Sequence, residues 1–131
     1  NGKNPVRVVL DRLGKINENY FVKDKSVKTI FITESENLSS HENIIYENAI
    51  FDIRLAEKIC SILQKHSIQS IIIEGGKKTL DTFIDAGLWD EARVFKGTTL
   101  FSNGTKAPRL NGKYVEKKIK NDQLLTYYNH D

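Results

Sequence analysis

The stretch Ile68-Gln69-Ser70-Ile71-Ile72-Ile73-Glu74-Gly75-Gly76-Lys77-Lys78-Thr79-Leu80 joins an apolar run to two glycines and the start of a helical pattern. Its β-branched run has no polar alternation, which predicts a strand that is buried on both faces. Glu74 lies at the carboxyl end of this predicted strand, and Gly75 and Gly76 allow a sharp turn and the close approach of another molecule. Apolar residues then follow helical spacing up to Gly87, the predicted C-terminal stop of the helix: Leu80, Phe83, Ile84 and Leu88.

The start of this predicted helix is a candidate site for an anion such as a phosphate, because a helix begins with free backbone N–H groups. No Ser, Thr, Asp or Asn stands at the expected N-cap to accept hydrogen bonds from these groups. Lys77 and Lys78 also oppose the helix dipole by roughly 0.3–1 kcal/mol each. A bound anion would offset both defects. The spacing matches neither a dinucleotide fingerprint nor a P-loop, so an ordinary strand-to-helix turn without a ligand remains the alternative.

The rest of the chain alternates further strands with one long helix. Short β-branched and aromatic runs predict strands at 6–10, 28–33, 43–46, 91–96, 114–120 and 123–128. Asp52 is the expected N-cap of the helix, whose apolar stripe consists of Ile53, Ala56, Ile59, Cys60 and Leu63. A helix between two strands predicts a right-handed parallel crossover, whereas the short link Asn121-Asp122 predicts an antiparallel hairpin. The predicted fold is therefore α/β, with a mixed sheet that is parallel at its centre and ends in an antiparallel C-terminal hairpin.

A second candidate site is the pair Asp11-Arg12, which follows the first predicted strand. Ligands of open α/β sheets gather at the carboxyl ends of parallel strands. The alternative is a turn acid next to a solvated arginine.

Composition limits the function classes. The length of 131 residues predicts a single domain over residues 1–131. The net charge of +3 without a basic block gives no indication of a nucleic-acid partner. No apolar run is long enough to cross a membrane and no signal peptide opens the chain, so we expect a cytoplasmic protein. Cys60 is expected in the core, with a reactive thiol as the alternative, and one cysteine with three histidines predicts no metal site.

Four fragments, in this order, resemble the reductase domain of the bifunctional riboflavin-biosynthesis deaminase/reductase. They are Asn4-Pro5-Val6-Arg7-Val8-Val9-Leu10-Asp11, Ser70-Ile71-Ile72-Ile73-Glu74-Gly75-Gly76, Ala86-Gly87-Leu88-Trp89-Asp90-Glu91 and Ala107-Pro108. The resemblance covers nearly the whole chain, but the chain covers only the C-terminal portion of that reductase domain. The absence of methionine and the start at Asn-Gly-Lys-Asn-Pro also indicate a piece of a longer protein.

The resemblance implies a fold similar to dihydrofolate reductase: a three-layer αβα arrangement with a mixed sheet, truncated at the N-terminus. It implies NADPH-dependent reduction of 5-amino-6-(5-phosphoribosylamino)uracil to the ribitylamino product. By position, Glu74 would face the substrate. The residues implied in cofactor binding are Arg12, Gly75, Gly76, Lys77, Lys78, Thr79, Leu80, Asp81 and Thr82. The His and paired Cys of the deaminase are missing, and no catalytic residue of the reductase is identified.

We expect little or no activity from the isolated piece, and a homodimer that covers the exposed edge of a truncated sheet. One alternative is another dihydrofolate-reductase-like enzyme that acts on a different pterin or pyrimidine. The other is a nucleotide-binding or assembly module without chemistry, in which Glu74-Gly75-Gly76 is only a tight turn.

Overall fold

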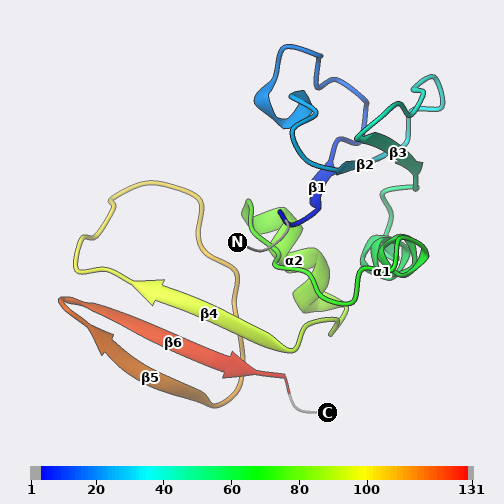
Figure 1. Ribbon diagram of the computed structural model, residues 1–131. Helices are drawn as coiled ribbons and strands as arrows, with labels where there is room; N and C mark the ends of the chain where they lie inside the picture. Colours follow the sequence, from blue (N-terminus) through cyan, green and yellow to red (C-terminus); the bar gives the residue numbers. More distant parts are fainter. Residues whose placement is uncertain (1–3, 130–131) are drawn as a thin grey trace. The chain divides into compact units, whose positions relative to one another are not determined.

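The computed structural model describes residues 4–129, and the chain divides after Gln69 into two compact units (Figure 1). The first unit contains parallel strands and the second contains antiparallel strands, and each unit has one α-helix. The predicted α/β class with both kinds of strand pairing is thus confirmed. The strands form two three-stranded sheets, one in each unit.

The first unit is built around a parallel sheet in the order β1-β2-β3. Its strands are β1 (Arg7–Leu10), β2 (Thr29–Thr33) and β3 (Ile44–Asn48), and a 3-10 turn, η1 (Phe21–Lys23), lies between β1 and β2. Every residue of β2 is buried, as expected for the central strand of a parallel sheet. The helix α1 (Leu55–Lys65) follows β3.

Most of the buried apolar side chains lie in this first unit, and they come from the central strand, from β3 and the residue after it, and from one stripe of α1. They are Ile30, Phe31, Ile32, Ile44, Ala49, Leu55, Ala56, Ile59 and Leu63. The rings of Phe31 and Tyr46 lie 5.4 Å apart, and the ammonium group of Lys23 lies over both of them. Lys23 also pairs with Glu18 at 2.9 Å, so this buried cation has both a charge partner and aromatic faces.

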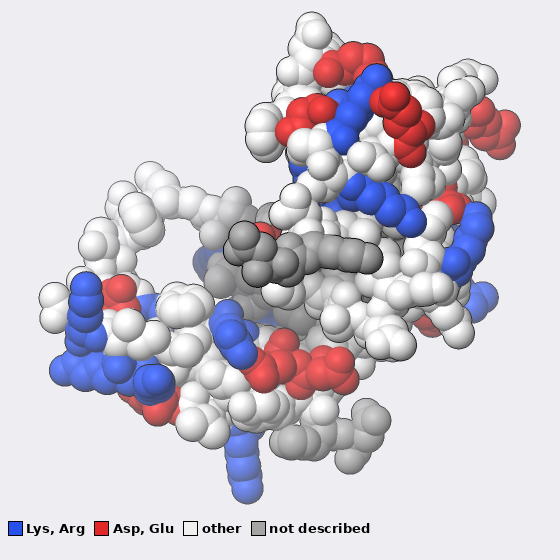
Figure 2. Space-filling view, in the orientation of Figure 1, with Lys and Arg blue, Asp and Glu red and all other residues white. Residues whose placement is uncertain are grey.

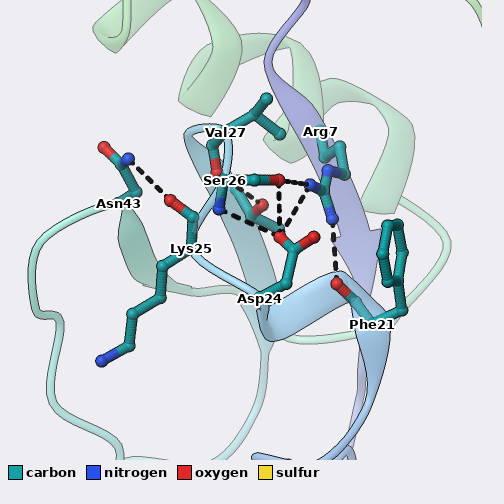
Figure 3. Close-up of polar contacts among 8 residues, drawn as sticks. Arg7, Phe21, Asp24, Lys25, Ser26, Val27 and Asn43 are labelled. Carbon is teal, nitrogen blue, oxygen red and sulfur yellow. Dashed lines mark hydrogen bonds and ion pairs between the residues drawn. The ribbon is translucent and has the colours of Figure 1, made fainter.

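Arg7 fastens the connection between β1 and β2 (Figure 3). Its terminal nitrogens donate to the carbonyl of Phe21 at 3.2 Å, to Asp24 at 2.9 Å and to Ser26 at 2.8 Å. Because all of these acceptors belong to the same connection, Arg7 has a structural role.

The second unit consists of α2 (Lys77–Asp85) and an antiparallel sheet in the order β4-β6-β5. Its strands are β4 (Glu91–Lys96), β5 (Tyr114–Ile119) and β6 (Asp122–Tyr128). The predicted hairpin is confirmed, but Ile119 pairs with Asp122, so the turn residues are Lys120 and Asn121 and not Asn121-Asp122. On the face in Figure 2, basic side chains gather around this sheet. The exposed lysines of β5 and its flanks are Lys113, Lys117, Lys118 and Lys120.

The strand predicted from Ile68 to Ile73 is wrong. These residues pair with none of the described strands, and Ile71 and Ile72 are 39% and 85% exposed. A β-branched run fits a buried pleated surface, but it becomes a strand only when a neighbouring strand pairs with it. The crossover predicted through α1 therefore has no second strand.

Two expectations about α1 are also wrong. The N-cap is Arg54 and not Asp52, since the carboxylate of Asp52 accepts a hydrogen bond from the Arg54 N–H at 2.9 Å in the turn before the helix. Cys60 is exposed. The buried stripe of the helix consists of Leu55, Ala56, Ile59 and Leu63, and Cys60 lies next to this stripe on the solvent side. Partial burial still raises the pKa of the Cys60 thiol.

Candidate functional site

The candidate residues are divided between the units. Arg12 belongs to the first unit, and Glu74 to Thr82 belong to the second. Arg12 follows the end of β1, whereas Glu74 to Thr82 comprise the turn before α2 and the first two turns of that helix.

Asp11 closes the loop that follows β1. One of its carboxylate oxygens accepts a hydrogen bond from the N–H of Lys15 at 3.0 Å, and the other accepts one from the N–H of Ile16 at 2.8 Å. Both oxygens thus have backbone donors from the same loop. Asp11 therefore shapes the end of the strand, and Arg12 is the member of the pair that remains available for a ligand.

Arg12 is tied to the end of the neighbouring strand β2. Its Nε donates to Glu34 Oε2 at 2.9 Å, and Glu34 Oε1 accepts a hydrogen bond from the N–H of Phe51 at 2.7 Å. The hydrogen bond from Arg12, together with that from Phe51, holds the pKa of Glu34 below its usual range. Sequence reasoning missed Glu34. The only sequence signal was its position directly after a predicted strand.

An open hollow of about 390 Å³ lies beside the same strand ends. Its lining is mixed and holds no basic residue: Thr33, Ser35, Glu36, Leu38, Tyr46 and Asn48. Gly14, with φ of +64°, lies against this wall, since a Cβ there would come within 2.8 Å of Leu38 Cδ1. The hydroxyl of Thr33 donates to the carbonyl of Arg12 at 3.2 Å, which connects the hollow to the arginine backbone.

In the second unit, Glu74, Gly75 and Gly76 form an exposed turn before α2. Glu74 makes no hydrogen bond or ion pair with residues 4–129. Gly75 has φ of +150°, so its backbone favours glycine. Gly76 is different: its φ of −70° suits any residue, and a Cβ there would meet nothing within 4 Å. Nothing in the described part of the chain requires glycine at this position.

Gly76 is the N-cap of α2 and forms no side-chain cap, as predicted. Its carbonyl accepts hydrogen bonds from the N–H groups of Thr79 and Leu80, at 3.0 and 3.3 Å. Within the described residues, the N–H groups of Lys77 and Lys78 have no acceptor. The first turn of α2 therefore presents two backbone donors that an anion could accept.

Some side chains of α2 have a partner within the helix, and others have none among the described residues. Lys77 forms an ion pair with Asp81 one turn later, so each restrains the other. The hydroxyl of Thr82 donates to the carbonyl of Lys78 at 2.9 Å. Lys78 is exposed and forms no ion pair among the described residues. It is the free cation next to the two backbone donors.

Elsewhere in residues 4–129, no group of three or more His, Cys, Asp and Glu side chains is placed to hold a metal ion. No helix in this range is long and apolar enough to cross a membrane.

The parallel sheet of the first unit, the antiparallel sheet of the second and the helix in each define the chain as an α/β protein. The family described as the RibD C-terminal domain matches residues 1–128, and the chain belongs to this family. The resemblance read from the four sequence fragments is thereby confirmed.

Solved structures show the same fold. The diaminohydroxyphosphoribosylaminopyrimidine deaminase/5-amino-6-(5-phosphoribosylamino)uracil reductase of Thermotoga maritima is 25% identical, with a TM-score of 0.73 over 95% of this chain. The Saccharomyces cerevisiae riboflavin biosynthesis reductase Rib7 is 17% identical, with a TM-score of 0.74 over 97% of this chain. The chain spans 38% of the length of the Thermotoga maritima protein and 70% of that of Rib7.

Proposed function

We propose that this chain takes part in the reductase step of riboflavin biosynthesis, the reduction of 5-amino-6-(5-phosphoribosylamino)uracil with NADPH. Membership of the RibD C-terminal domain family supports the reductase class, and the name of the Thermotoga maritima protein supplies this substrate. A homodimer in the cytoplasm and a deaminase partner domain are further parts of the proposal.

The main structural support for the proposal is the open backbone at Gly76, the N-cap of α2. Gly76 leaves the start of α2 without a side chain and with open space around it, so a ligand can approach the backbone there closely. The neighbouring N–H groups of Lys77 and Lys78 and the ammonium group of Lys78 suit a phosphate. We therefore assign the cofactor phosphates to Gly75–Thr82, with Gly76 providing close approach.

In this assignment the residues of α2 have different roles. Lys77, Lys78 and Thr79 contribute through the first turn of the helix. Asp81 holds Lys77, and Thr82 holds the backbone of the first turn. Leu80 is half-buried, and its N–H donates to the carbonyl of Gly76, so its part is to complete the first turn of the helix. NADPH would supply the hydride, and these residues would hold its phosphates.

Glu74 provides the test of the substrate half of the proposal. Its exposed carboxylate has no partner in residues 4–129, so it is free to accept hydrogen bonds from ribose hydroxyls. We expect Glu74→Gln to weaken substrate binding about tenfold or more, since a hydrogen bond to a charged group contributes about 1.5–3 kcal/mol. Binding of NADPH should change little.

The measurement is a pair of calorimetric titrations of the wild-type chain and of Glu74→Gln, one with the substrate and one with NADPH. Equal substrate affinities in the two proteins would contradict the role of Glu74. Binding of NADPH without binding of this substrate would favour another dihydrofolate-reductase-like enzyme. Binding of neither would favour a module without chemistry.

A further inference from the structure

The guanidinium group of Arg12 is held from one edge only. Its Nε donates to Glu34 Oε2 at 2.9 Å, and within residues 4–129 the group makes no other hydrogen bond. The side chain is 55% exposed. Both terminal nitrogens, Nη1 and Nη2, are therefore open to a ligand from outside.

Glu34 is itself fixed, so it can hold the arginine in one orientation. Its second oxygen accepts the N–H of Phe51 at 2.7 Å, and its own N–H donates to the carbonyl of Arg12 at 2.8 Å. Glu34 thus contacts both the backbone and the head group of Arg12, and only 24% of its side chain is exposed. An arginine restrained in this way loses less conformational entropy when it binds.

The other arginines of the first unit differ in ways that matter. Arg7 uses its terminal nitrogens for acceptors inside the protein. Arg54 donates through Nε to Glu57 at 2.7 Å, much as Arg12 does to Glu34, but its side chain is 73% exposed. In residues 4–129 the carboxylate of Glu57 accepts no backbone N–H, so this second pair is not anchored. Of the three, Arg12 alone combines an anchored partner with open terminal nitrogens.

We propose that Glu34 is a positioning residue that makes Arg12 a fork for a phosphate group at the carboxyl ends of β1 and β2. Two parallel N–H donors match two phosphate oxygens, and arginine binds phosphate in this way better than lysine does. The inference rests on the proposed function, because the family resemblance behind that function implies Arg12 in cofactor binding. It deepens that function by naming a phosphate as the group that Arg12 binds.

The sign of one mutational effect separates positioning from simple electrostatics. Glu34→Gln removes a negative charge next to the proposed site, so electrostatics alone would make an anion bind more tightly. A positioning role predicts weaker anion binding, because the Arg12 guanidinium, without Glu34, no longer keeps its two terminal nitrogens in the orientation that binds phosphate. A purely structural role predicts lower thermal stability with unchanged anion affinity.

The test is a titration of the full chain with inorganic pyrophosphate at low salt, followed by NMR. The backbone N–H signals of Glu34 and Phe51 report on this site, and those of Lys77 and Lys78 report separately on the glycine turn. We expect pyrophosphate affinity at the Arg12 site to fall about threefold to tenfold in Glu34→Gln and about tenfold in Arg12→Lys, which keeps the charge but loses the fork. Glu57→Gln is the matched control and should leave this affinity unchanged.

Equal or tighter binding by Glu34→Gln, or unchanged binding by Arg12→Lys, would overturn the proposal. If Glu34→Gln fails to fold, Glu34→Asp provides the same test: it keeps the charge, shortens the reach, and should also weaken binding. Pyrophosphate binding that depends on Glu34, without any NADPH binding, would support this inference while contradicting the proposed function. If the chain binds NADPH but Glu34→Gln leaves pyrophosphate affinity at the Arg12 site unchanged, the proposed function would be supported and this inference contradicted.

Discussion

Glu34 and Glu47 are both carboxylates with partners that are distant in the sequence. Glu34 joins Arg12 to Phe51, and Glu47 of β3 accepts hydrogen bonds from Lys65 at 2.9 Å and from the His66 ring at 2.6 Å, both at the end of α1. No local pattern predicts such pairs, because neither spacing nor periodicity relates residues that meet only after folding. For this reason sequence reasoning identified Arg12 as a candidate and missed the residue that orients it.

Glu47 gives a prediction about pH. Burial alone would raise the pKa of Glu47, but the hydrogen bonds from Lys65 and His66 outweigh burial and lower it. A folded-state pKa below the unfolded value of about 4.3 means that the stabilisation is complete above that pH and is lost as the pH falls through the folded-state pKa. We expect Glu47→Gln to cost about 1 kcal/mol at neutral pH and progressively less below about pH 4.

The measurement is the free energy of unfolding of the wild type and of Glu47→Gln between neutral and acid pH. Glu57→Gln is the control, since its exposed pair with Arg54 should contribute well under about 1 kcal/mol. A difference between wild type and Glu47→Gln that grows as the pH falls would contradict the account.

At the scale of elements, α1 and α2 end in the same way. The residue after each C-cap has a positive φ, +57° at Ser67 and +67° at Gly87. In both, the N–H of the following residue returns to the helix: Ile68 to the carbonyl of Leu63, and Leu88 to that of Phe83. These bonds define Schellman motifs, for which glycine is the preferred residue. The predicted stop at Gly87 is confirmed, and Ser67 occupies the equivalent position without glycine's freedom.

The two helix ends therefore predict opposite effects of exchanging serine and glycine. Ser67→Gly should stabilise the first unit by about 0.5–1 kcal/mol, because glycine adopts this left-handed conformation without the steric strain of a Cβ. Gly87→Ser should destabilise the second unit by about 1 kcal/mol through backbone strain alone, since a Cβ at Gly87 would meet nothing within 4 Å. Differential scanning calorimetry of the two variants and the wild type checks this. Shifts of the same sign in both variants would contradict it.

The elements also show which sequence signals are reliable. The strand predicted at 91–96 has the bounds of β4, and the predicted hairpin differs from β5 and β6 by one residue at the turn. These elements pair with close neighbours in sequence or alternate clearly in polarity. The run Ile71–Ile73 is entirely β-branched but pairs with no described strand. Pairing depends on a partner surface, which the run itself does not specify.

At the scale of the whole molecule, each unit supplies its own feature suited to an anion. The first offers Arg12 at the parallel strand ends, and the second offers the free N–H groups of Lys77 and Lys78 at the glycine turn. Sequence reasoning identified both places, because strand ends, glycines and uncapped helix starts leave local signals. The family match over residues 1–128 agrees with the resemblance, whereas the roles of individual residues stay predictions.

The assignment of the cofactor to the glycine turn is tested by calorimetric titration of the wild-type chain and of Gly76→Asp with NADPH, with NADH as a comparison. Aspartate is a strong N-cap and favours the helix dipole, so we expect this variant to be as stable as the wild type or more stable by about 0.5–1 kcal/mol. Its side chain and negative charge should nevertheless abolish binding of NADPH. Asn121→Asp adds the same charge in the β5–β6 turn and should bind as the wild type does. We expect selective NADPH binding by the wild type and its loss in a fully folded Gly76→Asp. Equal NADPH affinity in the wild type and Gly76→Asp would contradict the assignment.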